Sequence, residues 1–486
     1  MHAPRLPGAE QVEHATDRAT TVLVKRQFDC ALAWHWKLSS TVNWTLGKCA
    51  VAAMVALLGS VSTCLHADES NLGDFFTGGH VDGELRAYNF DRIYEYGQKP
   101  DARAFSSALM LNVQSGSFAS GFSVGASLVS ANALGTQSDT LSKVDVTLMG
   151  PHNSLTALSQ AYLQYKNDWL LIRGGDQYLN TPWLSNSDSR VLPASYEALF
   201  ASVTPVTGWS IYGIRSWGWK SRTSDGFYAD NLYYPSTYDG DSMYGNNGSL
   251  PATAHQANGA WTAGSAYTAG NLKAELWYYD FLHFARMTYV EGTYTFKTDT
   301  VLNPFVAMQY AKETGGSDNF LVETQTQLDG VAGNRVSSQI WGADIGTSIF
   351  DGHFDVAYNV LSQQAGAVGD GAIISPYTTT YTTDPLFTSS MLRGLVELGP
   401  GHAWKTRAGY GFFDDRLQLV TAYTKFFTAL RGDSHELYFD VIYDFRGDLK
   451  GLSLRDRIER SSGGADDLNP GNRPFTYNRV MISYKF

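Results

Sequence analysis

Residues 478–486 end the chain with the sequence NRVMISYKF. Side chains of a β-strand alternate between its two faces, so residues two positions apart share a face. The polar face of this stretch carries Arg479, Met481, Ser483 and Lys485. The other face is entirely apolar or aromatic, and this period of two predicts a β-strand with one apolar face. The residues of that apolar face are Val480, Ile482, Tyr484 and Phe486.

The same alternation recurs at residues 117–129, 271–278 and 435–445. Beyond the first 67 residues, no segment is apolar over the roughly 18 residues that a membrane-spanning helix needs. Apolar residues on one strand face and small or polar residues on the other are what a water-filled transmembrane barrel requires. A soluble β-sandwich or solenoid can alternate in a similar way. The aromatic last residue favours the barrel, because it resembles the closing strand that the outer-membrane assembly machinery recognises.

The sequence therefore predicts an all-β protein, a single antiparallel transmembrane β-barrel, with Phe486 as its contact to the barrel-assembly machinery. Turn sequences separate the alternating segments at hairpin spacing. The turn KND at residues 166–168 and the Asp351-Gly352 pair are expected to be short periplasmic turns. The long polar stretch at residues 222–258 is expected to be an extracellular loop.

The first 67 residues have the parts of a secretory leader. Lysines precede an apolar run at residues 49–61, and Ala67 follows it as a small residue at the cleavage position. The run is shorter than the roughly 20 residues that cross a bilayer as a helix. We therefore expect residues 1–67 to be removed and residues 68–486 to form the barrel domain.

All three cysteines, Cys30, Cys49 and Cys64, lie in the leader. A lipid attached to Cys64 is an alternative to simple cleavage, although the residues before it fit a lipobox poorly. Removal of the leader would leave the mature chain without a thiol. We therefore expect neither disulfides nor thiolate metal sites.

The composition argues against several function classes. The formal net charge is −11, and nucleic-acid binding needs clustered Lys and Arg, so we expect no nucleic-acid partner. Residues 121–125 match G-x-S-x-G, but a nucleophile elbow needs a strand-to-helix turn, and here the alternation continues through the motif. Asp239 and Asp241 are a weak calcium signal because the remaining oxygen ligands are lacking. We expect no enzyme activity, no cofactor and no metal.

Several segments follow one another in an order that is typical of one family. They are GELRAYNFDR at residues 83–92, a glycine-rich strand after Ser115, residues 171–200, residues 275–296 and LKGLSLRDR at residues 449–457. The most specific is NSDSRVLP at residues 186–193, a polar turn with Asp and Arg just before Leu-Pro. In these segments the sequence resembles the OprD-type substrate-specific outer-membrane porins. The resemblance implies a barrel of about eighteen strands, narrowed by inward-folded constriction loops and lined on one side by a ladder of arginines.

The candidate pore-lining residues are mostly arginines. Arg455 and Arg457 are two residues apart and so share a strand face. Asp456 would then lie on the lipid face, which requires a position near the interface or a β-bulge that shifts the register. Arg86 and Arg92 share a face and resemble the first-strand arginines of the family. For each arginine, a solvated charge at the rim is the alternative.

Asp188 and Arg190 belong to the segment that resembles the family's constriction loop, where acidic and basic groups face each other. They could instead pair with each other and brace the loop. Arg173 and Arg407 are weaker candidates, because the family's other ladder positions do not map clearly onto this sequence.

A narrow, partly dehydrated pore strengthens charge interactions, and arginines along one wall offer an anion successive bidentate sites. The resemblance and the arginines predict passive, selective diffusion of small carboxylates, such as amino acids or aromatic acids, through the outer membrane of a Gram-negative bacterium. Neutral sugars or chito-oligosaccharides are alternative solutes, and a barrel-embedded hydrolase is the alternative of a different class. The expected partners are outer-membrane lipids, lipopolysaccharide and the solutes, and the chain is expected to be a monomer or a homotrimer.

Overall fold

The computed structural model describes residues 70–95, 100–118, 120–235, 249–377, 385–464 and 474–486. The leader with its cysteines and the Asp239–Asp241 pair lie outside the described residues, so the expectations about them stay predictions. Among the described residues, no helix is both long and apolar enough to cross a membrane.

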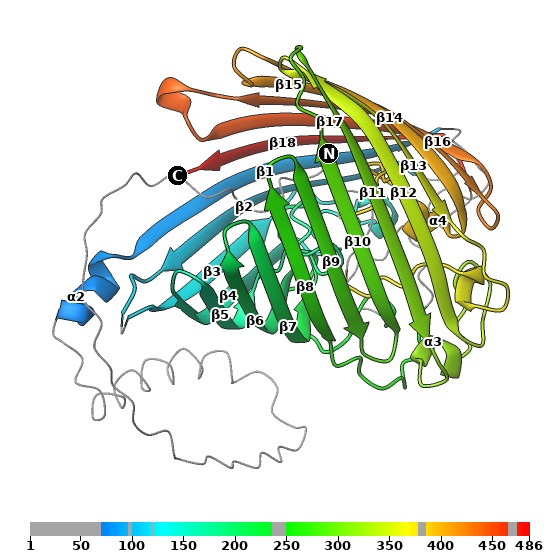
Figure 1. The fold of residues 1–486 in the computed structure, drawn as a ribbon, viewed down its shortest axis with the longest axis horizontal. Coiled ribbons are helices and arrows are strands. Elements are labelled where there is room, and N and C mark those ends of the chain that lie inside the picture. Colours follow the sequence, from blue (N-terminus) through cyan, green and yellow to red (C-terminus); the bar gives the residue numbers. More distant parts are fainter. Residues whose placement is uncertain (1–69, 96–99, 119, 236–248, 378–384, 465–473) are drawn as a thin grey trace. The chain divides into compact units, whose positions relative to one another are not determined.

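The described chain forms a closed sheet of eighteen antiparallel strands (Figure 1). Each strand pairs with its neighbours in the sequence, and β1 also pairs with β18. The predicted all-β barrel and the strand number implied by the resemblance are confirmed. The strands are β1 (His80–Tyr94), β2 (Ala102–Gln114), β3 (Phe122–Asn132), β4 (Ser154–Lys166), β5 (Leu170–Gln177), β6 (Ser195–Val206), β7 (Trp209–Lys220), β8 (Ala260–Ala269), β9 (Leu272–Phe281), β10 (Ala285–Thr295), β11 (Leu302–Gly315), β12 (Val336–Ile349), β13 (Gly352–Leu361), β14 (Gly401–Phe412), β15 (Leu417–Thr428), β16 (Ser434–Asp444), β17 (Leu452–Gly463) and β18 (Phe475–Lys485).

Helical structure in the described residues is short and lies in the connections. The α-helices are α2 (Ser70–Thr77), α3 (Phe320–Glu323) and α4 (Leu395–Leu398), and the 3-10 turns are η2 (Leu141–Lys143), η3 (Val368–Asp370) and η4 (Gly447–Leu449).

The C-terminal strand β18 closes the barrel against β1. Just beyond their paired residues, Gly83 and Phe486 exchange two backbone hydrogen bonds of 2.9 and 3.0 Å. A Cβ atom at position 83 would lie only 2.5 Å from the ring of Phe486. The ring of Phe486 therefore packs directly over Gly83, and a larger residue at position 83 would displace the ring.

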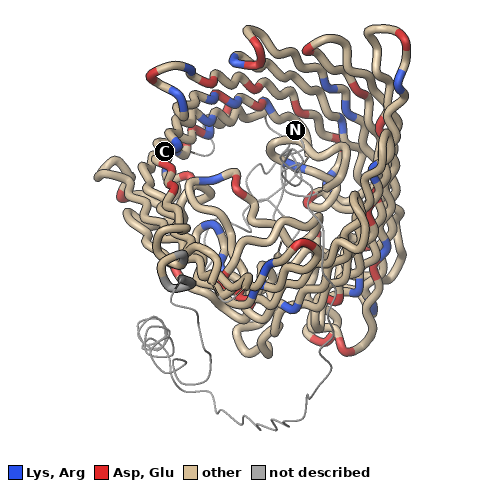
Figure 2. Tube along the Cα trace, turned by 60° about the vertical axis from the view of Figure 1, so that its left-hand side comes forward, with Lys and Arg blue, Asp and Glu red and all other residues tan. Residues whose placement is uncertain are grey.

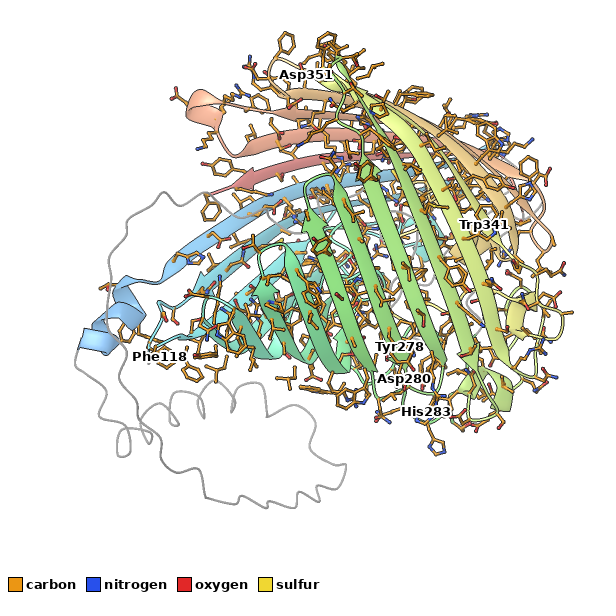
Figure 3. The ribbon with its side chains drawn as sticks, in the orientation of Figure 1. Phe118, Tyr278, Asp280, His283, Trp341 and Asp351 are labelled. Carbon is orange, nitrogen blue, oxygen red and sulfur yellow. The ribbon has the colours of Figure 1, made fainter. Side chains whose placement is uncertain are left out.

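Apolar side chains of the strands face outward. On β18, Ile482 and Tyr484 are 43% and 38% exposed, whereas Arg479 on the opposite face is buried. Tyr278 and Trp341, labelled in Figure 3, belong to the same exposed outer surface on other strands. An apolar outer wall is the surface that a barrel presents to lipid.

The predicted strand at residues 117–129 is wrong in its first part. The strand β3 begins only at Phe122, because Ser120 and Gly121 form a turn directly before it. Gly121 has a φ of 137° in this turn, a conformation that favours glycine. The G-x-S-x-G motif therefore begins in a hairpin turn and continues into a strand, rather than leading from a strand into a helix.

The β-bulge suggested for Asp456 is also wrong. β17 pairs without a register shift with both β16 and β18. Asp456 faces outward, and its Oδ1 accepts a hydrogen bond of 2.7 Å from Nδ2 of Asn478. A neighbouring amide, rather than a change of register, accommodates this carboxylate.

The longest loops all lie at one end of the barrel, where a short turn with His283 joins β9 to β10, and the other end has only short connections. Only Phe350 and Asp351 connect β12 to β13, and residues 167–169 connect β4 to β5, as predicted. Long connections, such as residues 178–194 and 362–400, lie at the other end. Figure 3 shows Asp351 at one end of the wall and His283 at the other. Because barrels have short periplasmic turns and longer extracellular loops, His283 marks the extracellular end.

Several of the long loops fold into the barrel, as the resemblance implied. Leu192 of the loop at 178–194 and Leu392 of the loop at 362–400 are fully buried. A buried backbone N–H needs an acceptor. Glu459 on β17 accepts hydrogen bonds of 2.9 and 3.0 Å from the backbone of Met391 and Leu392. Polar side chains of the inner wall therefore hold the loop in place.

Candidate functional site

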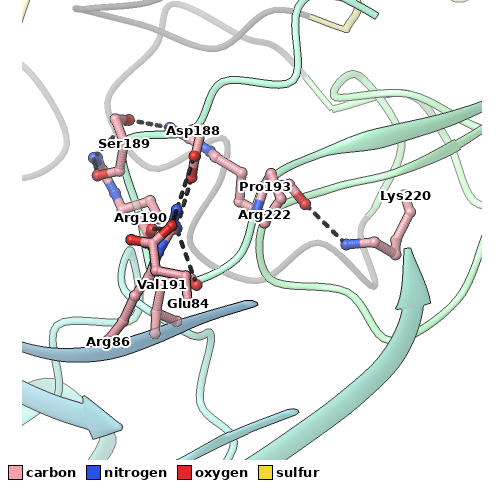
Figure 4. A network of polar contacts seen from close by, with 9 residues as sticks. All are labelled: Glu84, Arg86, Asp188, Ser189, Arg190, Val191, Pro193, Lys220 and Arg222. Carbon is pink, nitrogen blue, oxygen red and sulfur yellow. Dashed lines mark hydrogen bonds and ion pairs between the residues drawn. The ribbon is translucent and has the colours of Figure 1, made fainter. Parts of the chain in front are cut away.

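Arg86 on β1 holds the constriction loop, residues 186–193, against the inner wall (Figure 4). Its Nη1 and Nη2 donate to Oδ1 and Oδ2 of Asp188 at 2.7 and 2.8 Å. Its Nε and Nη2 donate to the carboxylate of Glu84 at 2.9 and 3.1 Å, and Nη1 also donates to the carbonyl of Arg190 at 3.0 Å. A guanidinium has five N–H donors, so all of those of Arg86 have partners. We call this arrangement the Arg86 clamp.

Asp188 is the loop's contribution to the clamp, and it pairs with Arg86 rather than with Arg190. Its side chain is 37% exposed. Burial acts to raise the pKa of Asp188, but the charge and hydrogen bonds of Arg86 lower that pKa more, so it lies below its ordinary value. The carboxylate is therefore ionised at neutral pH, and the clamp stays closed.

A cavity of about 320 Å³ adjoins the clamp. Glu84, Arg86, Asp188 and Lys485 contribute to its lining. Cavities of roughly this size accommodate small organic ligands. The clamp thus forms one wall of a space in which a small solute can meet both signs of charge.

Arg190 belongs to the constriction loop, and its side chain is buried, with 1% of its surface exposed. Its Nε donates to the carbonyl of Thr147 at 2.9 Å, and its guanidinium lies 5.6 Å from the ring centre of Phe90. Its Nη2 has no hydrogen-bond partner among the described residues. Burial lowers the pKa of Arg190, and the charges of Arg479 and Arg222 lower it further. Two other arginines therefore lie close enough to Arg190 to disfavour its charged form.

Arg479 on β18 is the functional candidate that sequence reasoning missed. It is fully buried, and its guanidinium lies 4.3 and 5.0 Å from the ring centres of Tyr477 and Phe90. None of its three side-chain nitrogens has a hydrogen-bond partner among the described residues. The signal was present, because Arg479 lies on the polar face of the closing strand. Its position directly opposite Arg457 becomes visible only from the pairing of β17 with β18.

Arg455 and Arg457 share one strand face, as their spacing predicts, and that face points inward. Arg455 makes two hydrogen bonds to Asp440, of 2.9 and 2.5 Å, and its side chain is 28% exposed. Arg457 donates from Nε and Nη2 to the hydroxyl of Tyr438 at 3.1 Å and lies 3.7 Å from Asp440. The carboxylate of Asp440 thus interacts with both arginines, and Arg455 is the more exposed of the two.

The remaining candidates each have a partner. Arg92 is fully buried on β1 and forms an ion pair of 3.4 Å with Asp145 from the loop between β3 and β4. Arg173 donates to Gln164 on the neighbouring strand. Arg407 on β14 pairs with Asp355 at 2.8 Å.

Beside the Arg86 clamp, whose arginine is already paired with Glu84 and Asp188, five further arginines lie where β17, β18 and β1 meet the constriction loop. Arg92 pairs with Asp145, and Arg455 and Arg457 share Asp440. Arg190 and Arg479 make no ion pair among the described residues. Figure 2 shows Lys and Arg positions along the strands beside the C-terminus. This part of the inner wall, the basic wall hereafter, consists of Arg92, Arg190, Arg455, Arg457 and Arg479.

No protein-family model and no curated protein matches the sequence. Solved structures do match. OccK9 (OpdG) of Pseudomonas aeruginosa is 15% identical with a TM-score of 0.68, and a BenF-like porin of Pseudomonas fluorescens Pf-5 is 15% identical with a TM-score of 0.66. OccK2 (OpdF) of P. aeruginosa, solved in complex with glucuronate, is 14% identical with a TM-score of 0.65. Each match covers 85% of this chain and 99% of the other.

At these identities the likeness concerns the fold. It places the barrel in the class of outer-membrane porin folds. Within that class, the fold is that of the OprD-type porins, which the sequence segments resemble.

Proposed function

We propose that the protein is a substrate-selective porin that lets small carboxylates diffuse passively across the outer membrane. The observation that carries the proposal is the excess of guanidinium over carboxylate in the basic wall, where Arg190 and Arg479 make no ion pair among the described residues. A region of the inner wall with more arginines than carboxylates raises the local concentration of anions and speeds their entry.

The proposed path combines exposed and enclosed charges. Arg455 is exposed enough to contact a solute directly, whereas Arg479 and Arg190 act through their field. At about 10 Å and an effective dielectric constant of about 20, one unit charge contributes about 1.7 kcal/mol, which corresponds to at least a tenfold change in anion occupancy. Asp440 interacts with both Arg455 and Arg457 and therefore weakens their attraction for a solute carboxylate. The solute can then leave the site again.

Glucuronate, the molecule bound by OccK2, is a carboxylate, which supports the same solute class for this chain. Neutral sugars remain the alternative solutes, since a sugar needs hydrogen bonds rather than net charge. A barrel-embedded hydrolase is the alternative of a different class. Ion conductance by the purified protein in a planar bilayer, without hydrolysis of added lipid or peptide, separates the channel from the hydrolase.

Arg479→Gln tests the proposal most directly, because Arg479 has no carboxylate partner that the substitution would leave unpaired. We expect the reversal potential in a salt gradient to shift toward cation preference. Uptake of a small carboxylate such as benzoate into proteoliposomes should fall about tenfold, while uptake of a neutral sugar of similar size should change little.

Arg103→Gln is the matched control, because Arg103 carries the same charge on the outer face and is paired with Asp91 at 3.1 Å. It should leave selectivity unchanged. Heat-modifiable migration on gels should verify that both variants fold. Equal transport of benzoate and sugar before and after Arg479→Gln, in a folded barrel, would refute the carboxylate assignment.

A further inference from the structure

Three basic side chains lie next to one another on the outer face of the barrel, at its long-loop end. They are His402 on β14, Lys425 on β15 and His435 on β16, which are adjacent strands. Lys425 is directly opposite His435, and His402 is opposite Phe427, two residues from Lys425. We call His402, Lys425 and His435 the outer basic patch.

The outward direction of the patch follows from strand alternation. On β16, Leu437 and Phe439 share the face of His435 and are 39% and 47% exposed, whereas Glu436 is buried on the inner face. On β15, Phe426 is fully buried, so its neighbour Lys425 points away from the lumen. The patch therefore lies on the lipid-facing wall.

Aromatic rings surround the patch. Nζ of Lys425 lies 4.6 Å from the ring centre of Phe427, and the ring of His402 stacks on Phe427 at 4.8 Å. His435 lies 6.0 Å from the ring of Tyr423. Aromatic side chains are enriched where a membrane protein meets the interface between lipid and water, and here they form the surface from which the basic groups project.

Among the described residues no carboxylate forms an ion pair with the patch, although Asp433 precedes His435 by two residues. On the outer face, Lys425 is flanked by Trp404, Tyr423, Phe427 and His435, and it makes no ion pair among the described residues. An outward-facing arginine of the same barrel differs in this respect. Arg286, at the same end of the barrel, has the carboxylate of Asp280 at 3.8 Å.

We propose that the outer basic patch binds a phosphate group of a glycolipid in the outer leaflet. A cation and two imidazoles match the charge and the acceptors of a phosphate, and basic residues at the headgroup level are the usual partners of anionic lipids. The surrounding rings would pack against the lipid's acyl chains. The inference rests on the outer-membrane location in the proposed function, but not on which solute the pore carries.

Native mass spectrometry of the detergent-purified mature protein provides the test. The probe is lipid A with its phosphates intact, compared with lipid A from which phosphatase has removed them. Wild-type protein should retain the phosphorylated form and lose it about fivefold more readily after Lys425→Gln. The dephosphorylated form should bind wild-type protein and the variant equally weakly.

Arg286→Gln is the matched control and should retain phosphorylated lipid A as the wild type does. Equal retention of the two lipid A forms by wild-type protein would overturn the proposal, even if Lys425→Gln failed to fold. Undiminished binding by a folded Lys425→Gln barrel would overturn it as well. Conductance and benzoate selectivity should be unaltered by Lys425→Gln, so a failure of the carboxylate pore and a failure of the lipid site are distinguishable.

Discussion

At the scale of single residues, inward-facing arginines have different roles because their partners differ. All the N–H groups of Arg86 donate hydrogen bonds within the clamp. Arg86 therefore fixes the constriction loop and has no N–H group left to bind a solute. Arg455 shares its carboxylate and is partly exposed to the lumen. Arg479 is held between aromatic rings without a hydrogen-bond partner among the described residues. Position on the inner face alone therefore does not identify a solute contact.

Replacing Asp188 tests the clamp. Asp188→Asn preserves the size of the side chain but removes its charge, so Arg86 keeps only Glu84 as an ionic partner. We expect the constriction loop to loosen, and current fluctuations in single-channel recordings to become several-fold more frequent. Asp91→Asn, which alters an outward carboxylate paired with Arg103, should leave the recordings unchanged. Identical fluctuations in all three proteins would show that the clamp does not restrain the loop.

The clamp also predicts a pH dependence. The pKa of Asp188 is depressed in the folded protein, so its stabilising contribution is fully present above the ordinary aspartate pKa of about 3.9 and is lost as the pH falls through the depressed value. Wild-type channels should therefore be quiet at neutral pH and resemble Asp188→Asn only below about pH 4. Fluctuations that begin near pH 6 would implicate another group.

At the scale of elements, the closing strand β18 serves both sides of the wall. Its outer face carries Ile482, Tyr484 and Phe486 toward lipid, while Arg479 and Lys485 face inward. Because successive residues alternate between the two faces, the same strand carries apolar side chains on its outer face and charged side chains on its inner face.

Deleting Phe486 tests the role of this element in assembly. The deletion removes an exposed aromatic ring and the two backbone hydrogen bonds to Gly83. We expect less of the heat-modifiable folded form in outer membranes, at unchanged synthesis. Phe350→Ala is the control, since Phe350 is a more exposed ring in a turn. An unaltered folding yield would contradict the assignment of the terminal strand to the assembly machinery.

At the scale of the whole molecule, the barrel is apolar outside and encloses its own loops. Its largest buried clusters contain loop residues such as Trp183 and Leu395 together with inward strand residues such as Tyr279. The loops therefore act as the core of the barrel, and they narrow the lumen at the same time. The strand number and closure leave room for this arrangement, since barrels of this size are wide enough to hold a channel.

Export of the whole chain is open to a direct test. If the leader is cleaved after Ala67, protein from outer membranes should begin at Asp68, and thiol labelling of the mature chain should find no reactive cysteine, because all three precede that position. N-terminal sequencing and maleimide labelling would check this. An intact leader, or a lipidated Cys64, would contradict it.

The sequence by itself determined the all-β barrel, its closing strand and the shared strand face of Arg455 and Arg457, because strand alternation is local and is decided by residues two positions apart. The resemblance supplied the strand number and the inward loops. Residues 117–121 were misassigned because small and apolar residues can continue an alternating pattern through a turn.

Only the tertiary structure decided which charges are paired. Arg86 meets Asp188 across 102 positions, and Arg92 meets Asp145 across 53. Arg479 comes to face Arg457 only through the register of two strands. Inward-folded loops have no period from which such contacts can be read, and the pairing of a buried charge depends on every group that burial brings near it. The basic wall is therefore a property of the closed barrel and not of any one segment.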